Sequence, residues 1–454
     1  MPHSSIVHDL RSAHSADALL TGAPLPTLLY FALPIILGNI FQQLYSIVDA
    51  IVVGNFLGDL PLSGISVASP IVDVANALVI GGTIGVGVLC AHYCGAGEGE
   101  RLRCMNATAL LGGGALTLLI ALCGIFFSTP LLRAQGTEEA VCREAAVYLQ
   151  LVFAGLLFCF LYNYYAAMLR SCGNSRTPFL ILLLSSTLHA LLDVLFVGVF
   201  GWGIRGVAFS TVLCQALAAA ACILYAQRRC PPLLLRPADL RFDRQMARLV
   251  LSYAWAAALQ QAVVCIGRLL VQGMLTPLGT STVTGYNMSL RTEQFLFCFS
   301  QGISAAMVVC LSQNLGHGDR PRARRFFRIS VLVELALIAL LGTVCFLFPA
   351  RIVGLFSDNA DVIAAGAQYT GAMAYLYVFA YLGEVIQGFF RGLGRLRLTM
   401  VASLLQVLLR VVLSYLLIPV WGMYGICAAV VSGWVLLAGI EGAYAVRKSR
   451  ALAA

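Results

Sequence analysis

LLYFALPIILGNIFQQLYSIVDAIVVGNF, residues Leu28–Phe56, is the stretch that decides the fold. It contains one charged residue, Asp49, and it is longer than the roughly 20 apolar residues that a helix needs to cross a bilayer. The whole chain has this character, since 60% of its 454 residues are hydrophobic and 11% are charged. A soluble fold does not hide that much apolar surface from water. We therefore predict an all-α integral membrane protein without a separate soluble domain.

Further apolar runs, separated by charged or Gly/Pro-rich breaks, predict twelve transmembrane helices. They are Leu28–Phe56, Ser66–Tyr93, Met105–Phe127, Tyr148–Leu169, Pro178–Phe200, Gly206–Ala226, Leu251–Leu275, Val283–Asn314, Ile329–Phe348, Tyr369–Phe390, Leu398–Val420 and Tyr424–Val446. The breaks divide the chain into a cytoplasmic tail (1–26), a six-helix lobe (27–226), a cytoplasmic connection (227–248), a second six-helix lobe (249–446) and a second cytoplasmic tail (447–454).

Basic residues in the loops predict the sidedness of these helices, because cytoplasmic loops carry an excess of lysine and arginine. With both termini inside, 22 basic residues fall on the cytoplasmic side and 4 on the outer side. Three more, Arg268, Arg291 and Arg410, lie within helices. The N-terminal residues lack the basic start and apolar core of a signal peptide. The net charge of +9 follows from membrane topology, so we expect no nucleic-acid partner.

The two halves repeat each other. Glycines of the first half recur 221 residues later: Gly58, Gly64 and Gly97 correspond to Gly279, Gly285 and Gly318. Each half has an even number of predicted helices, so both copies insert in the same direction, as in parallel-repeat transporters. Two equivalent lobes suit a protein that opens alternately to the two sides of the membrane.

The segment from Gln42 to Gly58, QQLYSIVDAIVVGNFLG, resembles the opening signature of bacterial MATE (multidrug and toxic compound extrusion) transporters. Gly-x-Gly turns after helices two and eight, and the endings LRSCG and FRGLG of helices four and ten, also match. The resemblance runs from about Leu25 to Val446 and is closest to the DinF-like branch. It implies a multi-pass protein of the bacterial inner membrane that exports small amphipathic, typically cationic, compounds in exchange for H⁺ or Na⁺.

Asp49 and Asp193 are the best candidates for coupling, because ionisable residues inside membrane spans are costly and often functional. Both helices run outward in the predicted topology, and the two carboxylates fall at similar depth. His189 lies one helical turn before Asp193 and on the same face. The family's cation site matches Asp49 and Asp193, which implies a proton or Na⁺ site there. Asparagine is more usual in the family at position 189, and proline at position 194.

The second lobe replaces this acidic site with basic residues, since Asp49 and His189 correspond to Arg268 and Arg410. We expect these arginines to be partly neutralised by Glu384 or Glu293; alternatively they line the cavity and attract anionic substrates. Glu334, near the inner end of its helix, is expected to reach the membrane surface. The candidate substrate-cavity residues are Gln42, Gln43, Tyr162, Asn163, Gln260, Gln261, Glu293, Arg268, Glu384 and Arg410.

The 15 cysteines are scattered through apolar runs, so a disulfide framework is not expected. The densest group, Cys90-Ala-His92-Tyr-Cys94, offers three ligands and no second cluster, and we predict no metal there. We predict no cofactor and a monomer surrounded by lipid. A flippase for lipid-linked oligosaccharides stays open as an alternative because of the intramembrane arginines. No catalytic motif of an enzyme is present.

Overall fold

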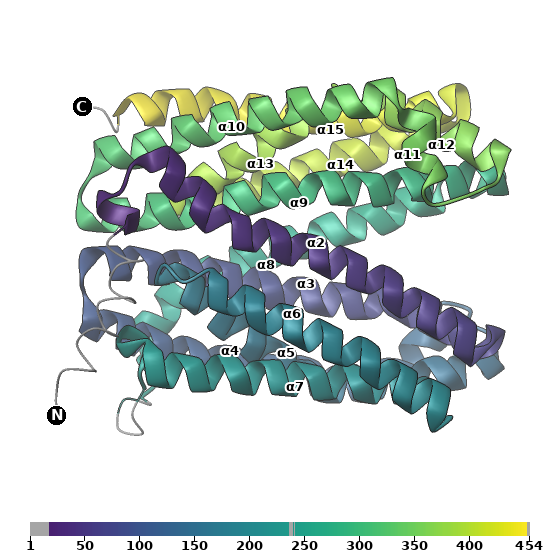
Figure 1. Ribbon diagram of the computed structural model, residues 1–454, viewed down its shortest axis with the longest axis horizontal. Coiled ribbons are helices and arrows are strands. Elements are labelled where there is room, and N and C mark those ends of the chain that lie inside the picture. Colours follow the sequence, from purple (N-terminus) through teal and green to yellow (C-terminus); the bar gives the residue numbers. More distant parts are fainter. Residues whose placement is uncertain (1–17, 236–238, 240, 452–454) are drawn as a thin grey trace. The chain divides into compact units, whose positions relative to one another are not determined.

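The computed structural model describes residues 18–235, 239 and 241–451, and every element in these ranges is a helix (Figure 1). Most of the predicted N-terminal tail, residues 1–17, lies outside the described residues. The long helices are α2 (Pro24–Leu57), α3 (Asp59–Ala96), α4 (Gly99–Ala134), α5 (Glu139–Ser171), α6 (Arg176–Asp193), α7 (Ile204–Arg229), α8 (Arg244–Gly273), α9 (Thr280–His317), α10 (Arg320–Leu347), α12 (Ala360–Met373), α13 (Tyr377–Gly392), α14 (Leu396–Trp421) and α15 (Met423–Ala451). Eleven described helices are long and apolar enough to cross a membrane, or twelve if the bent pair α12 and α13 counts as one span. The predicted all-α membrane fold is confirmed.

The tenth predicted helix is not continuous. It is divided into α12 and α13, whose axes are bent by 58°. A short helix, α11 (Pro349–Gly354), precedes the pair. At the break, the carbonyl of Ala374 lies against Gly342 of α10, where an added Cβ would be 2.8 Å from that oxygen. This contact comes from packing between distant segments, and the local apolar pattern does not reveal it.

The fifth predicted helix also changes form. The α-helix α6 ends at Asp193, and the chain continues as a π-helix, η1 (Val194–Val199). Short π-helical turns are rare and occur often at functional sites. The change of winding therefore falls directly after the candidate coupling residue.

The internal repeat is visible in α3 and α9, which are both 38 residues long. Gly58 and Gly279 precede these helices with φ of 74° and 90°, and Gly97 and Gly318 end them in the left-handed conformation. Glycine adopts positive φ at little cost, whereas other residues do not. The predicted glycine correspondence thus reflects equivalent starts and ends of two equivalent helices.

The chain forms two compact units: unit 1 contains residues 37–262 and unit 2 contains residues 22–36 and 263–454, apart from the N-terminal segment. The division falls inside α2 and α8 and not in the connection between the lobes. Close helix contacts explain this. Gly81 of α3 faces the backbone of Ala257 in α8, and Gly302, its repeat counterpart in α9, faces Ile36 in α2. The second helix of each unit therefore packs on the start of a helix that continues into the other unit.

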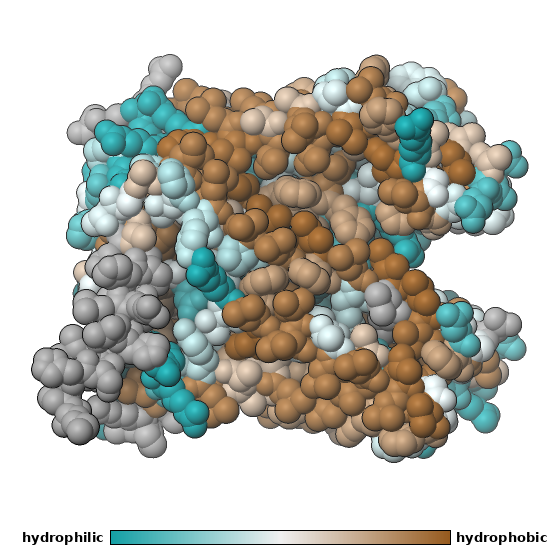
Figure 2. All heavy atoms as spheres, viewed as in Figure 1, coloured by the Kyte–Doolittle hydropathy of each residue, from teal (hydrophilic) through white to brown (hydrophobic). Residues whose placement is uncertain are grey.

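The outer surface of the helices is apolar. Figure 2 shows hydrophobic residues over much of one face, with hydrophilic residues gathered toward the helix ends. Large side chains such as Phe126, Leu184 and Val420 are at least 70% exposed. Extended apolar surface of this kind is unfavourable in water and suits contact with lipid tails.

Candidate functional site

Helices α2 and α6 of unit 1 lie side by side and run in the same direction. The rings of Phe41 and Phe179 are 6.1 Å apart near the start of the pair. Near its end, a Cβ on Gly198, in the η1 continuation of α6, would lie 3.1 Å from the ring of Phe56. Residue numbers therefore rise together along both helices, which sets the register for the polar residues between these contacts.

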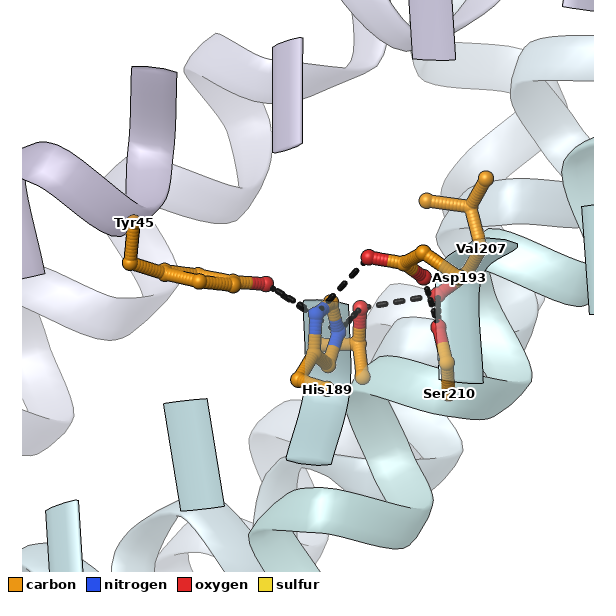
Figure 3. Close-up of polar contacts among 6 residues, drawn as sticks. Tyr45, His189, Asp193, Val207 and Ser210 are labelled. Atoms are coloured by element: carbon orange, nitrogen blue, oxygen red, sulfur yellow. Dashed lines mark hydrogen bonds and ion pairs between the residues drawn. The ribbon is translucent and has the colours of Figure 1, made fainter. Parts of the chain in front are cut away.

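A buried histidine and aspartate form the centre of the site (Figure 3). Nδ1 of His189 lies 2.9 Å from Oδ2 of Asp193, and their side chains are only 5% and 0% exposed. Their i, i+4 spacing on α6 places them on one face, as the sequence predicts. Ser210 of α7 donates a hydrogen bond to the other carboxylate oxygen, Oδ1. Oδ2 has no hydrogen bond of good geometry among the described residues, which leaves it able to accept a proton.

His189 also bonds residues of two other helices. Its Nδ1 hydrogen-bonds the hydroxyl of Tyr45 on α2, and its Nε2 lies 2.9 Å from Oγ1 of Thr211 on α7. The Thr211 hydroxyl donates its proton to the carbonyl of Val207 at 2.8 Å, so its oxygen is free to accept from Nε2–H. One imidazole thus connects α2, α6 and α7.

The protonation state of His189 decides which partners it can satisfy. As an imidazolium it donates from both nitrogens, to Asp193 and to Thr211. When Nδ1 has lost its proton, that nitrogen becomes an acceptor for the Tyr45 hydroxyl. Gain or loss of one proton therefore changes the bond between α2 and α6. The carboxylate of Asp193 and the hydroxyl of Ser210 are also hard oxygen ligands, which small cations such as Na⁺ prefer.

Asp49 lies in α2, but its side chain is outside the described part of the structure. Its helical position is informative. Tyr45 and His189 are in contact, the two helices are parallel, and Asp49 and Asp193 each follow by four residues. The backbone at Asp49 is therefore level with Asp193, as the predicted shared site requires.

The predicted cavity residues of unit 1 differ in burial. Gln42 is exposed, whereas Gln43, Tyr162 and Gln261 are partly buried. Gln260 is buried, with 5% of its surface exposed. The amide of Asn163 donates to the carbonyl of Cys159 in its own helix at 2.9 Å. Their role in substrate binding stays a prediction.

In unit 2, Glu293 of α9 is close enough to Arg410 and Arg268 for electrostatic attraction, with Arg410 contributing more. Arg268 is exposed on α8 and Arg410 is partly buried. Of the two acids expected to neutralise these arginines, Glu293 is therefore the one that interacts with them, and Glu384 pairs with a different arginine. Oε1 of Glu384 lies 2.5 Å from Nη2 of Arg391, seven residues later at the end of α13.

Replacing Arg391 with methionine should destabilise the protein by about 2 kcal/mol, because it leaves the partly buried carboxylate of Glu384 without its charged partner. The double change Arg391→Met/Glu384→Gln should recover most of this loss. Thermal unfolding in detergent, followed for the wild type, the two single variants and the double variant, measures the coupling. Additive effects of the two single changes would contradict the pairing.

The expectation for Glu334 is wrong. Its side chain is 0% exposed in the interior of unit 2, and neither carboxylate oxygen has a hydrogen-bond partner among the described residues. The hydroxyl of Ser300 is near, but it too lacks hydrogen-bonding geometry. Glu441 of α15, which sequence reasoning did not single out, is in the same situation. Both interact electrostatically with Glu384, so three acids share one part of unit 2.

The structure also corrects the view that the Cys90–Cys94 motif has no further ligands nearby. Cys172 joins Cys90 and Cys94, and the three Sγ atoms lie within 4.8 Å of one another. His92, by contrast, is exposed and faces away from this group.

Comparison with known proteins identifies the family. A family model described as MatE matches residues 34–195 and 256–416, one segment in each half of the chain. The probable multidrug resistance protein YpnP of Bacillus subtilis is 27% identical over 387 residues, which cover 85% of this chain and 86% of that protein. A FAD transporter of Shewanella oneidensis is 26% identical and covers 76% of this chain and 77% of its own length.

Solved structures agree on the fold. A MOP superfamily transporter from Pyrococcus furiosus, described as having a binding pocket of reverse polarity, superposes with a TM-score of 0.89 at 19% identity, covering 96% of this chain and 98% of its own. An outward-facing multidrug resistance MATE family transporter gives 0.86 at 19% identity and the same coverage. With both halves matched in sequence and the fold matched over nearly its whole length, the chain belongs to the MatE family.

Proposed function

We propose that this protein exports small amphipathic organic compounds, chiefly cations, in exchange for H⁺ or Na⁺, by alternating access of its two halves. The observation that carries the proposal is the buried His189–Asp193 pair inside a membrane span, bonded to both neighbouring helices. A carboxylate at this place must be functional or be held by partners, because burying a charge in a membrane is costly. Several relatives described as multidrug resistance proteins support the substrate class.

The coupling follows from the hydrogen bonds of the site. A proton on Nδ1 of His189 makes that nitrogen a donor to the Asp193 carboxylate, so it no longer accepts from the Tyr45 hydroxyl. Loss of that proton restores the bond to Tyr45 and draws α2 toward α6. The imidazole favours H⁺ as the coupling ion, whereas the Asp193 carboxylate with the Ser210 hydroxyl would also suit Na⁺.

A second candidate function is export of anionic compounds, which include lipid-linked ones. Arg268 and Arg410 lie inside the membrane-spanning part of unit 2, and both act electrostatically on one acid there, Glu293. The relative described as a FAD transporter handles an anionic molecule. The charge of the substrate is therefore the property to test.

Purified protein in liposomes decides between the two. We expect an imposed pH gradient to drive efflux of a fluorescent cationic dye such as ethidium at least ten times faster than in empty liposomes. A sodium gradient applied separately shows which ion is used. If FAD moves and ethidium does not, export of anionic compounds replaces export of cationic compounds as the proposed function. If neither gradient moves either compound, the antiport proposal fails.

We further propose that the protein acts as a monomer in the bacterial inner membrane with both termini in the cytoplasm. The 22-to-4 distribution of basic residues supports this sidedness. Labelling of single cysteines, placed in loops on either side of the membrane, in intact cells checks this sidedness.

A further inference from the structure

Three cysteines, Cys90, Cys94 and Cys172, converge at one end of unit 1, and Cys230 follows the end of α7. The Sγ atoms of Cys94 and Cys172 are 3.2 Å apart, and those of Cys90 and Cys94 are 4.0 Å apart. Cys230 is outside the group in which all sulfurs lie within 4.8 Å of one another, but its side chain interacts with that of Cys172. In a tetrahedral thiolate site with Zn–S bonds of about 2.3 Å, neighbouring sulfurs are about 3.8 Å apart. The observed separations lie on both sides of this value.

The surroundings favour a cation. Cys94 is in the last turn of α3, Cys172 follows the last residue of α5, and Cys230 follows the last residue of α7. The C-terminal end of a helix carries partial negative charge, so three such ends attract positive charge. Cys90 belongs to the buried apolar core cluster of unit 1, and the partly buried Cys94, Cys172 and Cys230 pack against that cluster.

A regulatory disulfide fits the same cysteines less well. Reactive thiolates are typical of helix N-termini and basic surroundings, which stabilise the anion, whereas helix C-termini do not. The predicted topology also places this end of the helices in the cytoplasm, where thiols stay reduced. Reduced sulfurs that already lie close together are suited to a soft metal ion.

We propose that Cys90, Cys94, Cys172 and Cys230 form a binding site for a thiophilic divalent cation, with Zn²⁺ as its simplest occupant. The ion joins the inner ends of α3, α5 and α7 within unit 1 and so acts as a structural link. The proposal does not depend on the transported substrate or on the coupling ion.

The test uses the full-length reduced protein in detergent, stripped with a chelator and then titrated with Zn²⁺ in competition with a chromophoric chelator. We expect one Zn²⁺ per chain, an upward shift of the melting temperature on binding, and at least tenfold weaker binding in Cys94→Ala/Cys172→Ala. Cys142→Ala/Cys222→Ala, which changes two buried cysteines of the same unit outside the cluster, is the matched control and should bind Zn²⁺ as the wild type does.

Two further measurements keep the outcome decisive if the double variant folds poorly. Co²⁺ bound to the wild type should show the absorption of a tetrahedral thiolate site, and Cys230→Ala should change that spectrum by removing one sulfur. The proposal is overturned if the stripped wild type binds no Zn²⁺, or if the cluster and control variants bind it equally. A Cys94–Cys172 disulfide found by mass spectrometry in protein purified without oxidant would overturn it in favour of a redox site.

Discussion

Replacing Asp193 with asparagine is expected to abolish gradient-driven efflux, with a loss of at least tenfold in rate. Asparagine keeps the shape and can still accept from Ser210, but it neither takes up a proton nor attracts the His189 imidazolium. The measurement is dye efflux from liposomes at matched protein content. Folding should be preserved, since asparagine has nearly the same shape, keeps the bond from Ser210 and can also hydrogen-bond a neutral His189.

Asp358→Asn is the control for this experiment, because it makes the same chemical change at an exposed position in the loop between α11 and α12. It should transport as the wild type does. His189→Asn should reduce the rate less than Asp193→Asn does. The asparagine can still hydrogen-bond its neighbours, and the Asp193 carboxylate remains to take up the proton. Full efflux by the Asp193 variant would remove this residue from the coupling mechanism.

The helices were predictable because each transmembrane segment is a long apolar run bounded by charged or glycine-rich breaks. The repeat was predictable from glycines, since positive φ at Gly58 and Gly279 restricts the residue type. The bend between α12 and α13 was not, because the apolar run Tyr369–Phe390 shows no break, and the close contact of Ala374 with Gly342 at the bend joins residues far apart in sequence. Composition records which residues are apolar and not which backbones touch.

Half of the candidate site followed from the sequence. The pairing of His189 with Asp193 was predicted from helical spacing, and the structure places them together. Tyr45 was missed although it lies four residues before Asp49 and so on the same face of α2. The sequence did not indicate Ser210 and Thr211. Their hydrogen bonds to Asp193 and His189 depend on how α7 packs on α6.

The acids and cysteines show the same limit. Glu384 was one of two acids assigned to arginines of other helices, whereas its partner is on its own helix. The grouping of the cysteines could have been predicted, because Cys94, Cys172 and Cys230 each lie at the predicted cytoplasmic end of a helix. Residues at the same end of a bundle are neighbours even when the sequence separates them widely, so sidedness should be included in any search for metal ligands.

Replacing Gly85 with alanine should destabilise the protein by about 3 kcal/mol, at the upper end of what overpacking usually costs. The added Cβ would lie 2.4 Å from the carbonyl oxygen of Tyr253 and 2.9 Å from Cα of Ala254, both backbone atoms of α8. A flexible side chain could move aside, but here the whole helix must shift. The fraction of protein that stays in the non-aggregated peak after heating, measured by size-exclusion chromatography, reports the loss.

Gly82→Ala is the matched control, because it makes the same change three residues earlier in α3, where an added Cβ has no neighbour within 4 Å. Alanine is a better helix former than glycine by about 1 kcal/mol, so this variant should be slightly more stable than the wild type. The two substitutions are therefore expected to have opposite signs. Equal effects would mean that α3 and α8 do not approach at Gly85, and the packing that places the start of α8 in unit 1 would lose its physical basis.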